Sequence, residues 1–217
     1  MKLRYLVTPL VVVFLILCPK VLSAGNDAIY FKDGSVGSVY NPEDINKLRR
    51  GAEKGDPEYQ LAVGNLYYFG GALPQSYENA FRWYTKAAKN NNADAMNNVG
   101  LLYRDGKGTA VDYSKSMVFF RAAAHQDNPG AQYNIGVLYF AGMGATKNYV
   151  EAAKWFREGA LNNHPKAQFN YGTMLLRGLG MNKNVESGIK WIERAAENGH
   201  PDAKSYLRKL QEYSKNR

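Results

Sequence analysis

The sequence predicts an all-α protein, a right-handed α-solenoid of four helix-turn-helix units with a capping helix at each end. A glycine recurs at a constant interval of 36 residues, and an aromatic residue keeps the same interval. A constant period in this range is typical of solenoids, in which each unit buries its apolar face against its neighbours. The two series are Gly64, Gly100, Gly136 and Gly172, and Trp83, Phe119, Trp155 and Trp191.

Residues 1–24 are expected to be a signal peptide. Lys2 and Arg4 precede an apolar run over residues 6–17, and the small residues of Ser23-Ala24-Gly25 lie beyond it. This order is typical of secretory signals, and the run is shorter than the roughly 20 apolar residues that span a bilayer. The pattern predicts an exported protein, cleaved after Ser23 or Ala24 and located in the periplasm of a Gram-negative cell.

Cys18 is the only cysteine, and it lies within the predicted signal peptide. One interpretation is a lipoprotein attached to the membrane through Cys18. Leu17 and Pro19 argue against it, because lipid-attachment sequences resemble a pattern with a small residue just before the cysteine. The mature chain would then contain no thiol, so packing alone would stabilise an exported fold that has no disulfide.

Residues 25–40 are expected to form a flexible N-terminal arm, and residues 41–217 the α-solenoid repeat domain. The arm has little periodicity and several Gly, Ser and Asp residues, a composition typical of irregular segments. At its end, Asn41 suits an N-cap, Pro42 the first helical position, and Glu43 the first turn. The first helix is therefore expected to begin at Pro42.

The four units are expected to begin at Pro57, Ala93, Pro129 and Pro165. The recurring glycine lies inside the first helix of each unit, where glycine costs up to about 1 kcal/mol relative to alanine. Its repetition indicates a close approach of the second helix.

A further series, Gly70, Gly106, Gly142 and Gly178, indicates left-handed helix C-termini rather than a phosphate-binding loop, which would require a preceding strand.

The stretch AQYNIGVLYFAGMGATKNYVEAAKWFREGA, residues 131–160, carries these features together with paired Leu-Tyr, Trp-Phe and Ala-Ala positions. It resembles the Sel-like repeat, a relative of the tetratricopeptide repeats with a slightly longer unit. The resemblance covers residues 42–214. Two departures are expected to matter: Ala72 replaces the second loop glycine of the first unit, and Arg208 stands in the register of the recurring glycine. Arg208 indicates a capping helix after Pro201.

The resemblance implies a partner-binding surface on the concave side, lined by the first helix of each unit. We expect an apolar groove of five rings flanked by two arginines: Tyr68, Phe69, Tyr133, Phe140 and Phe169, with Arg104 and Arg177. Aromatic residues and arginine are the usual anchors of protein interfaces. The alternative is that some of these rings pack beneath neighbouring helices. Asn98, Asn134 and Asn170 recur in register, which favours structural hydrogen bonds to backbone between units.

Catalysis, a cofactor and a metal are not expected. The chain has three histidines, and His164 and His200 lie one unit apart, each before a proline in a linker. Helices pack about 10 Å apart, whereas zinc ligands lie about 2 Å from the ion. The carboxylates show no converging pair. The two histidines are therefore expected at turn or capping positions.

The formal charge of +9 falls to +6 without Lys2, Arg4 and Lys20. Lys and Glu alternate along most of the repeats, as on an ordinary solvated surface. The C-terminal residues from 204 onward are more basic. They predict a contact with acidic lipid headgroups or an acidic partner, and the alternative is a frayed chain end. Nucleic acid is not an expected partner of an exported chain.

The leading expectation is a non-catalytic, exported adaptor that binds a partner protein through its concave surface. One alternative is a periplasmic immunity protein that neutralises a secreted antibacterial effector such as a phospholipase. Another is an envelope structural module that contacts membrane or wall. The resemblance implies adaptor roles generally, and the residues do not separate these three interpretations.

Overall fold

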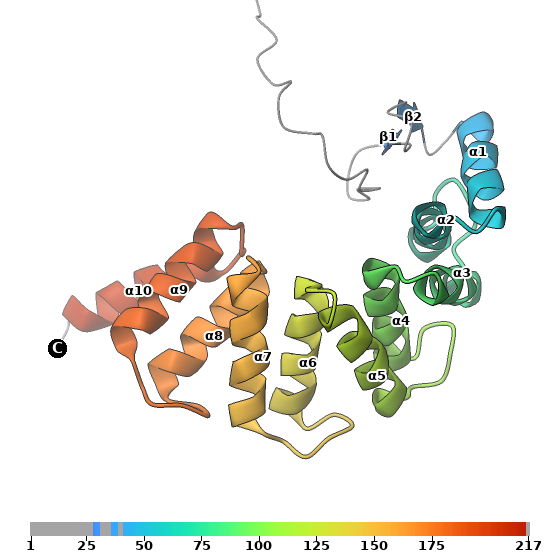
Figure 1. Ribbon diagram of the computed structural model, residues 1–217. Coiled ribbons are helices and arrows are strands. Elements are labelled where there is room, and N and C mark those ends of the chain that lie inside the picture. Colours follow the sequence, from blue (N-terminus) through green and yellow to red (C-terminus); the bar gives the residue numbers. More distant parts are fainter. Residues whose placement is uncertain (1–27, 31–35, 39–40, 216–217) are drawn as a thin grey trace, which may run out of the picture.

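The computed structural model describes residues 28–30, 36–38 and 41–215, and it forms a stack of helices. Ten helices follow one another in chain order across this part of the chain, from α1 at the upper right of Figure 1 to α10 at its left. They are α1 (Pro42–Glu53), α2 (Pro57–Phe69), α3 (Tyr77–Lys89), α4 (Ala93–Asp105), α5 (Tyr113–Ala124), α6 (Pro129–Ala141), α7 (Tyr149–Leu161), α8 (Pro165–Arg177), α9 (Val185–Glu197) and α10 (Ala203–Lys215). The predicted α-solenoid is confirmed.

Four helix pairs form the repeated units, and they are α2 with α3, α4 with α5, α6 with α7 and α8 with α9. The first helices begin at the four predicted residues. Helix α1 packs on α2 and α10 packs on α9, so the predicted caps are present at both ends. The predicted signal peptide, including Cys18, lies outside the described residues.

Two short strands, which the sequence did not predict, lie in the N-terminal arm. β1 (Ala28–Tyr30) and β2 (Val36–Ser38) pair antiparallel, with Ile29 opposite Gly37. Three residues are too few to show the alternation by which a strand is recognised in a sequence.

Side-chain caps define where the helices begin. Each of α1 to α9 has an N-cap residue whose side chain accepts a hydrogen bond from a backbone N–H of the first turn. In α1 the cap is Asn41, as predicted, with 2.9 Å between the Glu43 nitrogen and Asn41 Oδ1. Such caps stabilise a helix by about 1 kcal/mol each, and they explain why the boundaries follow the sequence closely.

The recurring glycine allows the two helices of each unit to pack closely, as predicted. A Cβ at Gly136 would lie 2.6 Å from ring atoms of Phe156, and one at Gly100 would lie 2.6 Å from those of Phe120. The rings of Phe120 and Phe156 are fully buried. Each pair of helices is therefore held at a separation that only glycine permits.

The loop glycines also follow the prediction, with one exception. Gly106, Gly142 and Gly178 are left-handed helix C-caps, whereas Gly70 has ψ −159° and ends α2 in a different conformation. The loop of the first unit thus takes its own path.

The hydrophobic core is a row of clusters rather than one centre. Successive clusters join α1 to α2, α2 and α3 to α4, α5 to α6, α7 to α8, and α9 to α10. The recurring aromatics connect them: Trp83 of α3, for example, packs against the cluster formed by α1 and α2. Every unit is consequently stabilised by its neighbours, as in other solenoids.

Candidate partner-binding surface

The candidate surface is made of the exposed and half-buried side chains of α2, α4, α6 and α8, which we call the first-helix face. It carries all seven residues that the sequence singled out. None of the five rings is fully buried: Phe69 is 59% exposed and Phe140 39%, while Tyr68, Tyr133 and Phe169 are half-buried. Each ring therefore has both a packed side and an accessible side.

The rings do not form one continuous groove. Tyr68 and Phe69 meet edge to face at the end of α2, with ring centroids 5.0 Å apart. Tyr133 and Phe140 lie on α6, and both contact the ring of Phe156, at 5.8 and 6.4 Å. Between these groups, α4 presents polar side chains. The expected groove is thus divided by the second unit.

Tyr68 is held by a lysine from the next unit. The Lys107 ammonium donates to the Tyr68 hydroxyl over 3.0 Å and lies 5.1 Å from the ring centroids of both Tyr68 and Tyr77. The hydrogen bond to Tyr68 raises the pKa of Lys107. Tyr68 is therefore part of a joint between units, which leaves Phe69 as the more accessible ring at this end.

Arg104 is already paired within the surface. Its guanidinium forms an ion pair with Asp105 at 2.6 Å and donates to Asn134 Oδ1 over 3.3 Å. Asn134 in turn donates to Asn97 Oδ1 over 2.9 Å. The expectation of a bond between units is right for Asn134, but its partner is a side chain rather than backbone, because Asn97 provides an acceptor in the preceding unit.

Arg104 also lies close enough to Tyr133 to affect its hydroxyl. Burial raises the pKa of Tyr133, while the Arg104 charge and a hydrogen bond with the Asn170 side chain oppose the rise. Six side chains from α4, α6 and α8 thus form one polar network across three units: Asn97, Arg104, Asp105, Tyr133, Asn134 and Asn170. Arg177, in contrast, is exposed at the end of α8 and has no carboxylate partner among the described residues.

Two histidines complete the surface, and the sequence did not identify this role. His164 caps α8 through Nδ1, which accepts from the Ala167 nitrogen over 3.2 Å. Its ring stacks on Tyr133 with a centroid distance of 4.8 Å, and His200 stacks on Phe169 at 4.3 Å. The expected turn or capping position is correct for His164. The missed signal was the aromatic residue at the same place in the preceding first helix, Tyr133 or Phe169.

The stacked histidines are uncharged near neutral pH. Burial is the main cause that lowers the pKa of His164 to about 4, and the positive charges of Lys166 and His200 add to the effect. Burial also lowers the pKa of His200, with Asp202 opposing the change. Because Nδ1 of His164 accepts a hydrogen bond, the imidazole proton of the neutral ring belongs on Nε2.

Within the described ranges, no group of three or more His, Cys, Asp or Glu side chains could hold a metal ion. None of the helices described is long and apolar enough to cross a membrane.

The Sel1 repeat model matches residues 57–92, 93–128, 129–164 and 165–200. These bounds begin at the first residues of α2, α4, α6 and α8. The chain belongs to the Sel1 repeat family. Sel1 repeat proteins generally bind protein partners and are generally non-catalytic scaffolds. A comparison with curated proteins finds no match.

Three solved structures are similar to this Sel1 repeat chain. The protective antigen c5321 of uropathogenic Escherichia coli is 30% identical with a TM-score of 0.74, covering 82% of this chain and 38% of its own. A Sel1 repeat protein of Oxalobacter formigenes is 31% identical with a TM-score of 0.67, covering 76% of this chain and 48% of its own. Helicobacter pylori cysteine rich protein B is 20% identical with a TM-score of 0.51, covering 61% of this chain and 96% of its own, and shares the fold. The chain thus spans less than half the length of the first two.

Proposed function

We propose that this Sel1 repeat protein is an exported, non-catalytic adaptor that binds a partner protein through the first-helix face. The observation that carries the proposal is the state of Phe140, which is 39% exposed although its ring rests on Tyr149 and Phe156. A ring that is held in place from below loses little side-chain entropy when a partner covers it. Tyr133 and Phe169 are supported in the same way by His164 and His200.

The principal contact is assigned to units three and four. Their first helices carry Tyr133, Phe140 and Phe169, whereas the second unit presents Arg104 already paired with Asp105. Aromatic anchors dominate the energy of many interfaces, and polar contacts around them exclude water. Arg177 lies at the exposed end of α8, where it is available to a carboxylate of the partner.

The test is capture of partners from the envelope of the cells that make the protein. The bait is the mature chain, used beside a Tyr133→Ala, Phe140→Ala double variant. A Val118→Ala, Val150→Ala variant is the matched control, because these apolar side chains of the second helices are 64% and 49% exposed. Circular dichroism and thermal melting verify that each variant is folded. A partner lost only from the first variant supports the proposal. Equal retention by both folded variants would contradict it.

The identity of the captured protein separates the narrower roles. A secreted lipid-degrading enzyme that is inhibited on binding would make the adaptor an immunity protein. Recovery of lipid or wall polymer alone, unaffected by either variant, would support an envelope structural module instead. Export is tested separately by N-terminal sequencing of the cell-made protein. A first residue of Ala24 or Gly25 is expected, and a chain that still begins at Met1 would contradict export.

A further inference from the structure

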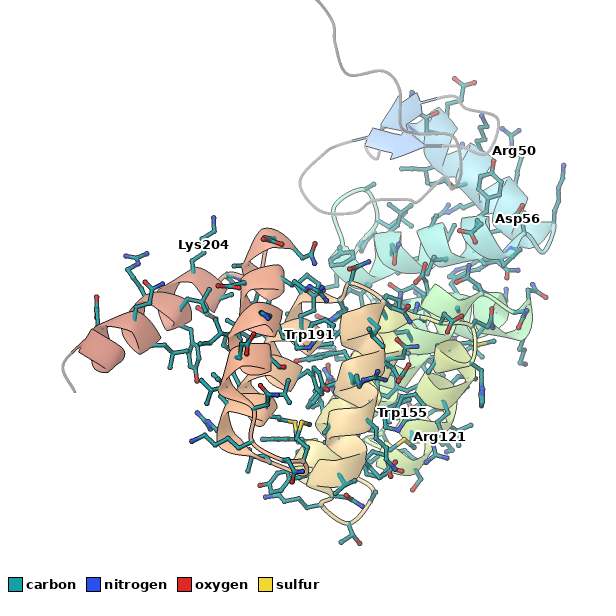
Figure 2. The ribbon with its side chains drawn as sticks, turned by 60° about the vertical axis from the view of Figure 1, so that its left-hand side comes forward. Arg50, Asp56, Arg121, Trp155, Trp191 and Lys204 are labelled. Atoms are coloured by element: carbon teal, nitrogen blue, oxygen red, sulfur yellow. The ribbon has the colours of Figure 1, made fainter. Side chains whose placement is uncertain are left out.

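A cation-lined opening lies where α1 meets α2, at the N-terminal end of the stack. It has a volume of about 700 Å³. Figure 2 shows Arg50 and Asp56 at this end, far from Lys204 on α10. We call this opening the α1 pocket, and the residues that matter to its chemistry are Lys47, Arg50, Gly51, Lys54, Asp56 and Tyr59. It lies at the beginning of α2, whereas Tyr68 and Phe69 lie at the end of that helix.

The packing of this junction differs from that of the other four. At the position of Lys47, the second helices carry an aromatic residue: Trp83, Phe119, Trp155 and Trp191. At the position of Tyr59, the following helices carry Ala95, Ala131, Ala167 and Ala203. At the junction of α1 and α2 the aromatic residue is therefore on the following helix, as Tyr59, whereas at the other junctions it is on the preceding helix. Tyr59 lies against Gly51, where a Cβ would be 2.5 Å from its ring, and this leaves the Lys47 position to a cation.

Within the described part of the chain, Arg50 lacks the ring contact that cations at equivalent positions of other units make. Lys86 lies 4.0 Å above the ring of Trp83, and Arg194 lies 4.8 Å above that of Trp191. Arg50 occupies the same register, but Lys47 stands where the ring would be. Across the described residues, neither Arg50 nor Lys54 forms an ion pair with a carboxylate. Both side chains are exposed.

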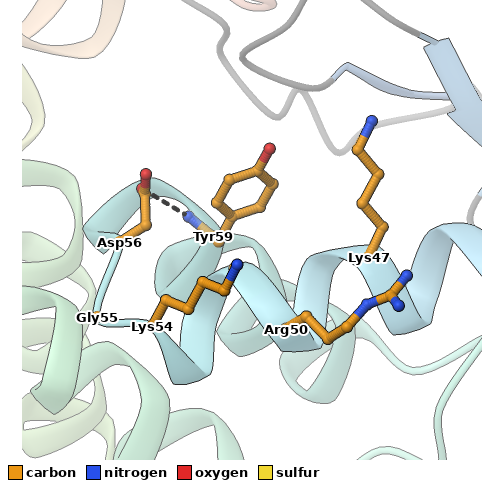
Figure 3. Close-up of a pocket in the computed structure, with 7 residues that line it drawn as sticks. Lys47, Arg50, Lys54, Gly55, Asp56 and Tyr59 are labelled. Atoms are coloured by element: carbon orange, nitrogen blue, oxygen red, sulfur yellow. Dashed lines mark hydrogen bonds between the residues drawn. The ribbon is translucent and has the colours of Figure 1, made fainter.

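The lining carries one carboxylate against three cations. That carboxylate, Asp56, is the N-cap of α2, and its Oδ1 accepts from the Glu58 and Tyr59 nitrogens over 3.0 and 3.4 Å. Figure 3 shows Lys47, Arg50 and Lys54 along one side of α1, beside Tyr59. Arg50 and Lys54 therefore have no carboxylate partner within the lining of the α1 pocket.

We propose that the α1 pocket binds an acidic segment of a peptide chain, whose carboxylates pair with Arg50 and Lys54. Residues four apart lie one turn apart on a helix, about 6 Å. Alternate side chains of an extended peptide are separated by roughly 6.5 Å, so two carboxylates at positions i and i+2 match this spacing. The proposal does not depend on the first-helix face.

The test measures binding of fluorescein-labelled hexaglutamate, with hexaglutamine as the uncharged probe. An Arg50→Ala, Lys54→Ala variant is compared with Arg82→Ala, Lys89→Ala, which removes two exposed cations of α3 and so changes the net charge equally. At low salt we expect the dissociation constant for hexaglutamate to rise about tenfold in the first variant and less than about twofold in the second. Hexaglutamine should not bind.

An equal loss in both variants would overturn the proposal, because it would show a diffuse response to net charge. Absence of hexaglutamate binding to the native protein would do the same. Arg50→Lys keeps the charge and should retain most of the affinity, which guards against a loss caused by misfolding. Inorganic phosphate and vesicles with anionic lipid form the remaining arms. If these bind through Arg50 and Lys54 while hexaglutamate does not, the assignment to a peptide is wrong.

Discussion

The first two junctions between successive repeats use different chemistry from the last two. At the first two, the N-cap asparagine of the next unit donates to an acid at the second position of the preceding first helix. Asn92 thus bonds Glu58 over 2.8 Å, and Asn128 bonds Asp94 over 2.7 Å. At the last two, Gly130 and Lys166 replace the acids, and His164 and His200 stack on Tyr133 and Phe169.

Both halves of this solenoid keep a contact between the N-cap residue and the preceding first helix, although different residues make it. When the acid is absent, the cap changes from asparagine to histidine and the first helix gains an aromatic ring. The exchange has a functional consequence, because it adds two half-buried rings, Tyr133 and Phe169, to the first-helix face in the C-terminal half. It also makes the stability of the C-terminal half sensitive to acid through its histidines. The junctions of the first half are instead stabilised by hydrogen bonds to the carboxylates of Glu58 and Asp94.

The largest expected effect concerns the feature that both halves share. Gly136→Ala should destabilise the protein by about 1–3 kcal/mol, because the new Cβ overlaps a buried ring that cannot move away. Gly100→Ala should cost a similar amount, since the approach to Phe120 is also 2.6 Å. Urea denaturation measures both. Gly130→Ala is the control, because its nearest neighbour would be 3.3 Å away, and its free energy of unfolding should change by less than about 0.5 kcal/mol. A cost at Gly130 equal to that at Gly136 would contradict the packing argument.

Acid should weaken the C-terminal half through His164. Its pKa is lowered to about 4 in the fold and is about 6.5 when unfolded. Between pH 6.5 and pH 4 the unfolded chain therefore binds more protons than the folded chain. The contribution of His164 to the free energy of unfolding is thus fully present above pH 6.5, and it is lost as the pH falls towards 4. After allowance for solvent screening, the loss attributable to this ring from pH 7.5 to pH 5 should be about 1–2 kcal/mol.

His164→Asn separates this loss from the general effect of protonating carboxylates. Asparagine is the cap found in the first half, so the helix should remain capped while the titrating ring is removed. The difference in free energy of unfolding between pH 7.5 and pH 5 should become smaller in the variant. An unchanged difference would show that His164 is not responsible.

The first half should respond to acid in the opposite direction when its cap is altered. In the native protein Asp94 accepts a hydrogen bond of 2.7 Å from the Asn128 side chain. Asn128→Asp keeps the oxygen that caps α6 but replaces this donor with a carboxylate that faces Asp94. The repulsion should cost about 1 kcal/mol at pH 7 and be relieved as one carboxylate is protonated. Thermal melts at pH 7 and pH 5 measure it. Asn128→Ser, a neutral cap, is the control, and it should show no such relief.

The smallest expected effect concerns a hydrogen-bond series that the second unit lacks. Asn90, Asn162 and Asn198 donate to Gln60, Gln132 and Gln168 over 3.0, 2.9 and 2.9 Å. In the same register the second unit has Gln126 and Met96, with 3.6 Å between nitrogen and sulfur. A Met96→Gln, Gln126→Asn double variant should gain up to about 0.5–1 kcal/mol. Each single variant should gain less stability than the double variant. If the two single changes in the free energy of unfolding add up to that of the double variant, the two new side chains do not form a direct hydrogen bond.

The sequence predicted the features that depend on local rules. Helix starts followed from caps and prolines such as Asn41 and Pro57, and the glycine series indicated the close second helix. These inferences hold because capping and helical periodicity depend on residues within one or two turns of each other. The seven candidate residues lie on the first helices, as their sequence positions require, and their role in partner binding stays a prediction.

The features that were missed depend on pairs of residues about one unit apart. Nothing local to His164 indicates its stacking on Tyr133, and nothing local to Arg104 indicates that it donates to Asn134. The α1 pocket likewise depends on a pair, because Lys47 and Tyr59 both differ from the residues at the same positions of every other unit. At each junction, the side chain that the neighbouring unit provides decides which contact a residue makes.

The most direct measurement of the adaptor proposal is hydrogen exchange of the native protein with and without the partner recovered by capture. Slower exchange in peptides from α6 and α8, with little change in α5 and α7, is the predicted result. It would place the partner on the first-helix face of the C-terminal half. Protection confined to the second helices, or to the two ends of the stack, would contradict this account.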